Sequence, residues 1–231
     1  MNKLLTVCPT KNRPDKCAKM LESFEKTSFS SDVLFVLDDD ERDIVEYIKL
    51  FKRYKACGNL ECLFLKPSNI TIQLNQVLSF SYYKDYDFYH ITNDDFVYHT
   101  LGWDHILCDK IKGFGISYGN DLFVKEKLPT APVISGNIVR ALGWLQMPKL
   151  THLYGDSSWN IIGRHFNKLY YCKDVIIEHQ HGLKNKEYKD ELFEHTNSQE
   201  MFAKDHKAML DWIRGEYQDD IAKIKEMINE S

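Results

Sequence analysis

The sequence predicts an α/β domain whose mostly parallel central sheet is covered by helices on both faces. Short apolar runs, such as 32–37 and 60–65, alternate along the chain with segments of helical spacing. These runs are continuously apolar, which is typical of strands buried on both faces of a parallel sheet. The chain has 231 residues, of which 43% are hydrophobic, so it is long enough to bury a sizeable core.

The first half of the sequence consists of regular strand and helix units. Strands are expected at 3–8, 32–37, 60–65 and 86–92, and helices at 15–26, 44–54 and 71–83. Two prolines keep 9–14 out of regular structure, so this stretch is a loop after the first strand. In the third helix, Ile72, Val77 and Phe80 are the expected core positions.

The second half is less regular. Strands are expected at 113–119, 130–137 and 175–181, helices at 137–145, 156–167, 199–214 and 216–229, and a polar, loop-rich stretch at 184–200. We expect 183–231 to form a loop and C-terminal helices that pack on the same domain as the rest of the chain. The side chains available for this packing are Met201, Phe202, Leu210, Trp212 and Ile213.

Charge, hydropathy and cysteine usage narrow the class of protein. The net charge of −4 argues against a protein that coats nucleic acid without specificity. There is no run of about 18 apolar residues and no apolar N-terminal stretch of signal length, so no membrane span is expected. The cysteines are scattered without a Cys-x-x-Cys pair, which predicts reduced thiols in a cytoplasmic protein and no structural zinc site.

The most informative residues are Asn93-Asp94-Asp95, which end the strand expected at 86–92. Two adjacent carboxylates repel each other, and a bound cation would compensate their charge. Oxygen ligands of this kind suit Mg²⁺ or Mn²⁺, which typically bridges protein carboxylates to a substrate diphosphate. The alternative interpretation is a solvated turn, because Asn and Asp favour turns.

Two further polar clusters also follow strands directly. One extends from Thr10 to Arg13, and the other extends from Asp38 to Glu41. In parallel sheets, ligands bind at the carboxyl ends of the strands, so we expect all three clusters to converge on one crevice. For the second cluster, the alternative is the solvated start of a helix, where acidic residues complement the helix dipole.

Together, these motifs resemble those of GT-A-type glycosyltransferases, the family-2-like enzymes that use a nucleotide-sugar donor. The similarity runs from Leu4 to about His181, and the end of this region looks like small bacterial and phage members. The motifs are Pro9-Thr10-Lys11-Asn12-Arg13-Pro14, Asp38-Asp39, Asn93-Asp94-Asp95, Leu101-Gly102-Trp103-Asp104, Gly143-Trp144, Gly155-Asp156 and Ile177-Glu178-His179-Gln180-His181-Gly182. The resemblance implies a single Rossmann-like catalytic domain over residues 1–182.

The resemblance also implies a donor site. Its nucleotide-sugar-binding residues would be Pro9, Thr10, Lys11, Arg13, Asp38, Asp39, Asn93 and Asp94. Arg13 would pair with the diphosphate through its planar fork, and Asp38 or Asp39 would contact a uracil base or the ribose. Asp95 would bind Mn²⁺ or Mg²⁺ directly. The metal motif departs from the common Asp-x-Asp form because its first position is Asn93.

Three residues near the C-terminal end of the domain complete the expected site. His179 and His181 lie two apart on a predicted strand and therefore share a face, and either would complete the metal shell beside a carboxylate. His181 is favoured because Gly182 would open space next to it. By resemblance, Asp156 is the catalytic base at the start of a helix, and the alternative role for Asp156 is a helix N-cap.

The sequence thus predicts a metal-dependent glycosyltransferase, of inverting mechanism, that moves a sugar from a UDP-sugar to an acceptor hydroxyl. The acceptor would be a glycan or modified DNA, the second in a phage-type enzyme acting on hydroxymethylated pyrimidine bases. A nucleotidyltransferase and a non-catalytic nucleotide-sugar binder are competing interpretations of the same motifs. The absence of glycine from 9–14 counts against nucleotidyl transfer, since such enzymes usually carry a Gly-rich loop there.

Overall fold

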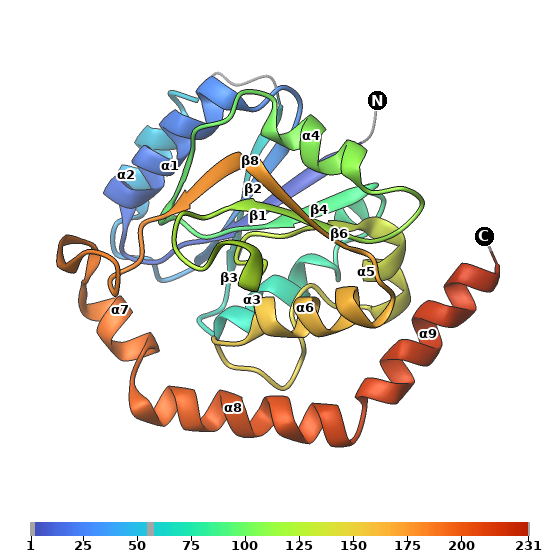
Figure 1. Cartoon of the computed structure of the whole chain (residues 1–231). Coiled ribbons are helices and arrows are strands. Elements are labelled where there is room, and N and C mark those ends of the chain that lie inside the picture. The colour runs from blue at the N-terminus through green and yellow to red at the C-terminus, as the bar shows by residue number, and fades with distance from the viewer. Residues whose placement is uncertain (1–2, 55–57, 231) are drawn as a thin grey trace.

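The computed structural model describes residues 3–54 and 58–230, which form one mixed sheet surrounded by helices (Figure 1). The strands are β1 Leu4–Pro9, β2 Asp32–Asp38, β3 Leu60–Leu65, β4 Phe88–Ile91, β5 Phe96–Tyr98, β6 Ile116–Asn120, β7 Val133–Ser135 and β8 Leu169–His179. The α-helices are α1 Pro14–Thr27, α2 Ile44–Phe51, α3 Ile70–Val77, α4 Trp103–Lys110, α5 Gly136–Leu142, α6 Gly155–His165, α7 Glu191–Thr196, α8 Gln199–Arg214 and α9 Tyr217–Asn229.

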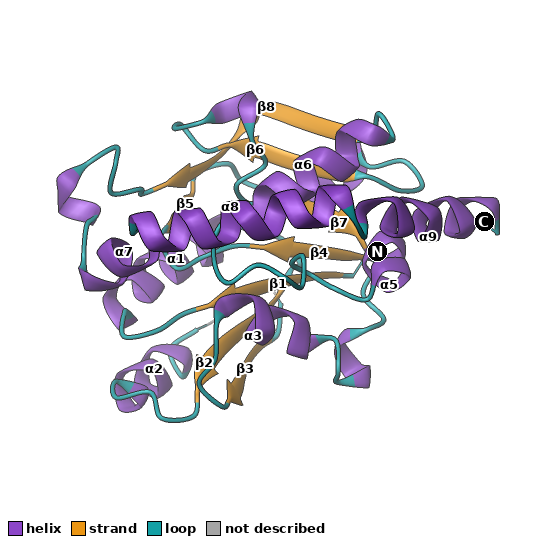
Figure 2. Ribbon diagram, turned by 90° about the horizontal axis from the view of Figure 1, so that it is seen from below, coloured by secondary structure: helices purple, strands orange, loops and turns teal. Residues whose placement is uncertain are grey.

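The sheet has the strand order β3-β2-β1-β4-β7-β6-β8-β5 (Figure 2). The first four strands in this order are parallel to one another, β7 is antiparallel to β4 and β6, and β8 runs parallel to β6. This confirms the predicted α/β class with a mostly parallel sheet. The carboxyl ends of β1, β2 and β4 therefore lie at one edge of the sheet, where α/β proteins bind ligands.

Strand β8 links this parallel region to the short edge strand β5. Its register against β6 shifts between Gly119 and Asn120, which pair with Cys172 and Ile176. Beyond the shift, β8 pairs antiparallel with β5, and Phe96 lies opposite His179. The irregularity re-aims the end of β8 toward the end of β4.

Apolar side chains alternate between the two faces of the sheet and fill a core on each. On β1, Leu5 and Val7 join the core under α3, α5 and α6, whereas Leu4 and Cys8 join the core under α1, α2 and α4. Figure 1 shows these two groups of helices on opposite sides of the sheet. This alternation follows from the two-residue period of a strand.

The C-terminal helices pack on the first of these cores. Met209 and Trp212 of α8 are buried there together with Ile224 of α9. In Figure 1, α8 runs along the side of the molecule that carries α3 and α6. No helix among the described residues combines the length and the apolar character that a membrane crossing requires. The described cysteines are free thiols, and Cys57 lies outside the described residues.

Two predicted core positions are wrong. Ile72 lies on the outer side of α3 and is 44% exposed, and Phe80 lies beyond the end of that helix at Val77 and is 41% exposed. Helix α3 buries the stripe Thr71, Leu74 and Val77 instead. In α8, Phe202 and Ile213 pack only at the surface, with 42% and 40% exposed, and the ring of Phe202 meets that of Tyr154. The stripe that α8 buries includes a carboxylate, and its members are Asp205, Met209 and Trp212.

His90 in the middle of β4 gives the fold an acid sensitivity. Its ring is fully buried between Pro132 O and the Tyr98 hydroxyl, at 3.2 and 2.9 Å. Burial lowers the pKa of His90 from 6.5 to about 3, so the unfolded chain binds one proton more than the folded chain between these pH values. Stability then falls as pH decreases through that window, by about 1.4 kcal/mol per pH unit for this single group.

We expect His90→Gln to flatten the dependence of unfolding free energy on pH between pH 6 and 4, as measured by urea denaturation. The matched control is His206→Gln, which alters an exposed imidazole on α8 and should keep the wild-type slope. Identical slopes for wild type and His90→Gln would contradict the assignment of a neutral buried imidazole.

Candidate active site

A cleft of about 500 Å³ opens at the carboxyl ends of β1 and β4 and extends to the start of α6 and to α7. The structure brings ten of the predicted site residues into its lining: Pro9, Thr10, Lys11, Arg13, Asn93, Asp94, Asp95, Asp156, His179 and His181. Asp38 and Asp39 are not part of the lining. Segments from four distant parts of the sequence therefore meet in one cavity.

The loop after β1 is fixed by hydrogen bonds to its neighbours. Thr10 Oγ1 donates to Asp94 Oδ2 at 2.7 Å and contacts the Tyr47 hydroxyl at 2.8 Å. The backbone N–H of Arg13 donates to the same hydroxyl at 2.9 Å. Asn12 between them has a φ of 54°, a left-handed conformation that Asn tolerates better than most residues. This turn aims Arg13 at the cleft.

Asp38 is covered by two residues that do line the cleft. Its oxygens accept hydrogen bonds from Lys11 Nζ and Gln73 Nε2, each at 2.5 Å, and its side chain is 1% exposed. Asp39 is exposed in the following turn, where its N–H donates to Leu65 O at 2.7 Å. Lys11 and Gln73, and not the two aspartates, therefore present the polar groups of this region to the cleft.

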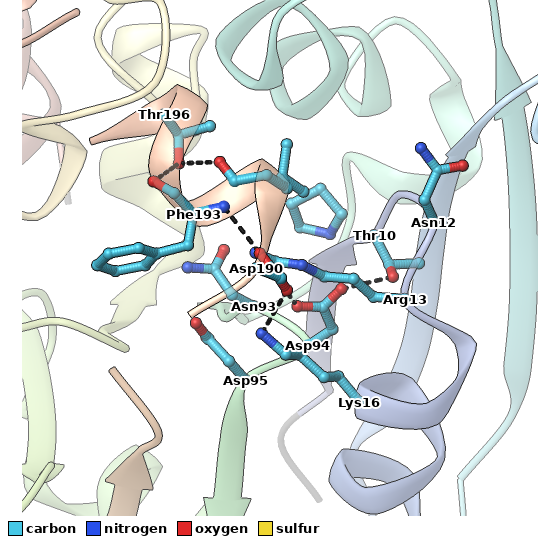
Figure 3. A network of polar contacts seen from close by, with 12 residues as sticks. Thr10, Asn12, Arg13, Lys16, Asn93, Asp94, Asp95, Asp190, Phe193 and Thr196 are labelled. Carbon is cyan, nitrogen blue, oxygen red and sulfur yellow. Dashed lines mark hydrogen bonds and ion pairs between the residues drawn. The ribbon is translucent and has the colours of Figure 1, made fainter. Parts of the chain in front are cut away.

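Asp94 is held by the loop between β1 and α1. Besides Thr10, it contacts Arg13, whose Nη1 lies 3.3 Å from Asp94 Oδ1. Burial and the adjacent Asp95 raise the pKa of Asp94, and Arg13 and Thr10 oppose this increase. The second guanidinium nitrogen of Arg13 reaches Asp190 at 2.5 Å (Figure 3). Asp94 thus positions Arg13 within the cleft.

Asp95 and His179 form a partly buried pair, 14% and 13% exposed, at the junction of β4, β5 and β8. His179 Nε2 lies 3.5 Å from Asp95 Oδ2, and the backbone N–H of Gln180 donates to Asp95 O at 2.8 Å. Burial would raise the pKa of Asp95, but the facing imidazole outweighs it and the pKa is lowered. Burial would lower the pKa of His179, but Asp95 outweighs it and the pKa is raised. Without a metal the two groups therefore favour the charged pair, and an ion bound there would take the place of the imidazole proton.

The donor set of this pair suits a hard divalent cation. Asp95 Oδ1 and His179 Nδ1 are buried and have no hydrogen-bond partner in the described part of the chain. Within residues 3–54 and 58–230, no three His, Cys, Asp or Glu side chains converge as a complete metal cage. Mg²⁺ and Mn²⁺ are commonly held by one or two protein ligands together with substrate phosphates, so the residues present fit such an ion.

His181 lies farther from the carboxylates than His179 does. Its ring stacks on Phe123 at a centroid distance of 5.0 Å and meets the edge of Phe193 at 5.1 Å. The space beside Gly182 is filled, since a Cβ there would lie 2.8 Å from Phe193 Cζ. The glycine therefore accommodates Phe193, and the structure brings His179 and not His181 next to Asp95.

Asp156 lies in the first turn of α6 and is not its N-cap. The N-cap is Tyr154, with a φ of 66°, and the helix begins at Gly155. Asp156 Oδ1 accepts the N–H of Ser157 at 2.7 Å, and the side chain lines the cleft. Burial raises the pKa of Asp156 above its ordinary value of 3.8. A carboxylate with a raised pKa is a stronger base, which suits proton abstraction.

A buried carboxylate of α8 supports the cleft wall that precedes Asp156. The backbone N–H groups of Thr151, His152 and Leu153 donate to Asp205 at 2.8, 2.7 and 2.7 Å. All three donors line the cleft, whereas Asp205 itself is 0% exposed. Burial lowers the pKa of His152. The C-terminal helix therefore determines where this wall lies.

Several cleft residues were missed by sequence reasoning. Asn69 and Gln73 follow the end of β3, so the rule that located the other clusters also applies to them. A second group of missed residues lies in the loop before α6 and on or directly after α7, and it includes His152, Leu192, Phe193, His195, Thr196 and Asn197. No motif marks this second group, because it is brought to the cleft only by the packing of the C-terminal helices.

Solved structures of glycosyltransferases share this fold. The chain is similar to the mannosyltransferase PcManGT from Pyrobaculum calidifontis in complex with GDP-Man and Mn²⁺, with a TM-score of 0.61 and 10% identity over 78% of this chain. It is also similar to TarS of S. aureus in complex with UDP, with a TM-score of 0.56 and 13% identity over 76% of this chain. A third similar structure is GlyE of Streptococcus pneumoniae, with a TM-score of 0.52 and 11% identity over 88%.

These likenesses confirm the GT-A-type fold that the sequence motifs predicted. The chain spans 57%, 59% and 52% of the length of those three proteins. No protein-family model and no curated protein sequence matches the chain.

Proposed function

We propose that the protein is a glycosyltransferase that moves a sugar from a nucleotide diphosphate sugar to an acceptor hydroxyl. The observation that carries the proposal is the meeting of cationic and acidic groups in one cleft of a glycosyltransferase fold. Lys11 and Arg13 supply positive charge to the cleft, and the Asp95–His179 pair supplies metal ligands. A bound diphosphate needs cationic side chains as well as metal ligands, because its negative charge is neutralised by cations and by a bridging metal.

In this proposal, each segment of the cleft has a task. Arg13 binds the diphosphate through its guanidinium, and Asn93 contacts the sugar or ribose through its amide. Asp95 and His179 hold Mn²⁺ or Mg²⁺, which when bound stabilises the negative charge of the leaving diphosphate. Asp156 takes the proton of the acceptor hydroxyl as its oxygen bonds to the anomeric carbon, and the nucleotide diphosphate leaves from the opposite face of the sugar, which makes the transfer inverting.

We further propose UDP as the nucleotide of the donor. The resemblance of the sequence motifs favours uridine, and TarS, one of the similar structures, is a complex with UDP. The complex of the mannosyltransferase contains GDP-Man, so guanosine is the competing base. The two possibilities are separated by direct comparison of the nucleotides.

The test is a thermal-shift and calorimetric panel of UDP, GDP, CMP and dTDP, each with and without Mn²⁺. We expect UDP with Mn²⁺ to stabilise the wild type by about 2–3 kcal/mol at 100-fold excess over its Kd, a shift of several degrees in Tm. Asp95→Asn should lose the part of this stabilisation that depends on Mn²⁺, since it removes a charged ligand without changing shape. If no nucleotide stabilises the wild type, with or without the metal, the proposal is wrong.

The matched control is Asp109→Asn, which alters an exposed carboxylate on α4 outside the cleft lining. This variant should respond to UDP and Mn²⁺ as the wild type does. An equal loss of the response in both variants would show that general charge, and not the Asp95 site, determines metal-dependent binding.

A further inference from the structure

Helix α7 is anchored to the cleft by an ion cluster that no sequence motif marks. Asp190 Oδ1 lies 2.5 Å from Arg13 Nη2, and Asp190 Oδ2 lies 2.7 Å from Lys16 Nζ (Figure 3). The side chains of Arg13, Lys16 and Asp190 are 13%, 26% and 33% exposed, so the cluster is partly shielded from water. Two cations from the start of α1 thus hold one carboxylate from the far end of the chain.

This arrangement of two cations is suited to bind a phosphoryl group. Two oxygens of one anion are each held by a separate cation, as a phosphate is held by converging Arg and Lys side chains. Arg13 also lines the cleft next to Asp94 and Asp95. A diphosphate that binds Arg13 therefore has to compete with Asp190 for the same guanidinium.

Asp190 also determines the position of α7. The N–H of Phe193 donates to Asp190 Oδ1 at 2.8 Å, so Asp190 is the N-cap of this helix. The helix contributes Leu192, Phe193, His195 and Thr196 to the cleft lining. Whatever displaces Asp190 from α1 therefore releases one wall of the cleft.

We propose that Arg13 Nη2 and Lys16 Nζ form a phosphate subsite for the donor. In the free protein Asp190 occupies this subsite. The donor displaces Asp190 when it binds and thereby loosens α7. This inference rests on the proposed function and adds Lys16 to the donor-binding residues. The C-terminal segment then acts as an internal competitor for the donor phosphate, and donor binding opens the wall formed by α7.

The first test compares two charge-neutralising variants at neighbouring positions. Asp190→Asn keeps the N-cap, because Asn caps as well as Asp, but it removes the competing charge. We expect its affinity for UDP with Mn²⁺, and for inorganic pyrophosphate, to rise about three- to tenfold over wild type in calorimetry. Glu191→Gln makes the same change in net charge at a residue that forms no ion pair within the described part of the chain, and it should bind as the wild type does.

The variant Lys16→Gln distinguishes two roles for Lys16: direct contact with the donor phosphate, or only holding Asp190 in place. If Lys16 contacts the donor phosphate, the variant binds UDP and pyrophosphate more weakly than wild type. If Lys16 only tethers Asp190, the variant binds more tightly, as Asp190→Asn does, and the assignment of Lys16 is overturned.

Hydrogen exchange of 190–197 on addition of UDP and Mn²⁺ gives the deciding readout. Increased exchange supports displacement of Asp190, whereas decreased exchange, or an unchanged affinity of Asp190→Asn, overturns the inference. Failure of the proposed function looks different: the wild type would bind no nucleotide. Tighter pyrophosphate binding by Asp190→Asn in that case would still support the anion subsite.

Discussion

Replacing Asp156 by asparagine is expected to reduce the rate of sugar transfer by about 10²–10⁴-fold, the usual contribution of a general base. The amide has nearly the same shape as the carboxylate but cannot accept the acceptor proton. The Asp156 carboxylate hydrogen-bonds to Ser157 rather than to Arg13 or the Asp95–His179 pair, so donor binding should be retained. The measurement is turnover, followed as release of UDP, together with the Kd for UDP and Mn²⁺ by calorimetry.

The pH dependence gives this prediction a second readout. Because burial raises the pKa of Asp156 above 3.8, the wild-type rate should fall as pH decreases through that raised pKa. The residual rate of Asp156→Asn should lack this acid limb. The control Asp174→Asn alters a carboxylate that is 88% exposed and should keep both rate and profile. If Asp156→Asn turns over at the wild-type rate, Asp156 is not the catalytic base. If the wild type binds the donor but never turns it over, the protein is a non-catalytic nucleotide-sugar binder.

Asp205→Asn is expected to be the most destabilising single change, lowering the unfolding free energy by about 2–4 kcal/mol. The carboxylate accepts three backbone N–H groups, at distances of 2.7–2.8 Å, from the loop that precedes α6. An amide whose oxygen takes the place of Oδ2 still accepts the N–H groups of His152 and Leu153, but its NH2 group then opposes the N–H of Thr151. Chemical denaturation monitored by tryptophan fluorescence measures the change in midpoint.

The control for Asp205 lies on the same helix. Asp211→Asn alters a carboxylate that pairs with Lys207 at the surface, and exposed pairs contribute little to stability. Its denaturation midpoint should stay close to that of the wild type. Equal midpoints for Asp205→Asn and the wild type would show that the loop 151–153 is held by other contacts.

The N-terminal half of the fold was predictable because its strands are buried on both faces. The run from Asp32 to Leu37, for instance, is apolar without a break after its first residue and becomes β2. Strand β5 was not predicted, since three residues directly after Asp95 form a strand only through pairing with β8. Helix α7 was missed for a related reason. Of its residues only Phe193 and Thr196 are buried, so no apolar periodicity marks it.

The candidate site was predictable at the level of segments but less so at the level of side chains. Strand ends located the clusters that contain Thr10 and Asp95, because topology alone brings carboxyl ends together. The same rule placed Asp38 at the cleft edge, but it gave no indication that Lys11 and Gln73 would cover it. Which of the two histidines faces Asp95 depends on where Phe123 and Phe193 pack, and neither position follows from the local sequence.

The register shift in β8 implies that some parts of this strand tolerate insertions and deletions during evolution better than others do. An insertion or deletion at the exposed residues 173–174, where β8 leaves the β6 ladder, would be absorbed without disturbing the pairing of Phe96 with His179. A one-residue change between Ile176 and His179 would turn the imidazole to the opposite face and bring a neighbouring side chain to Asp95. Homologous proteins should therefore vary in length at the first segment and keep a constant spacing in the second.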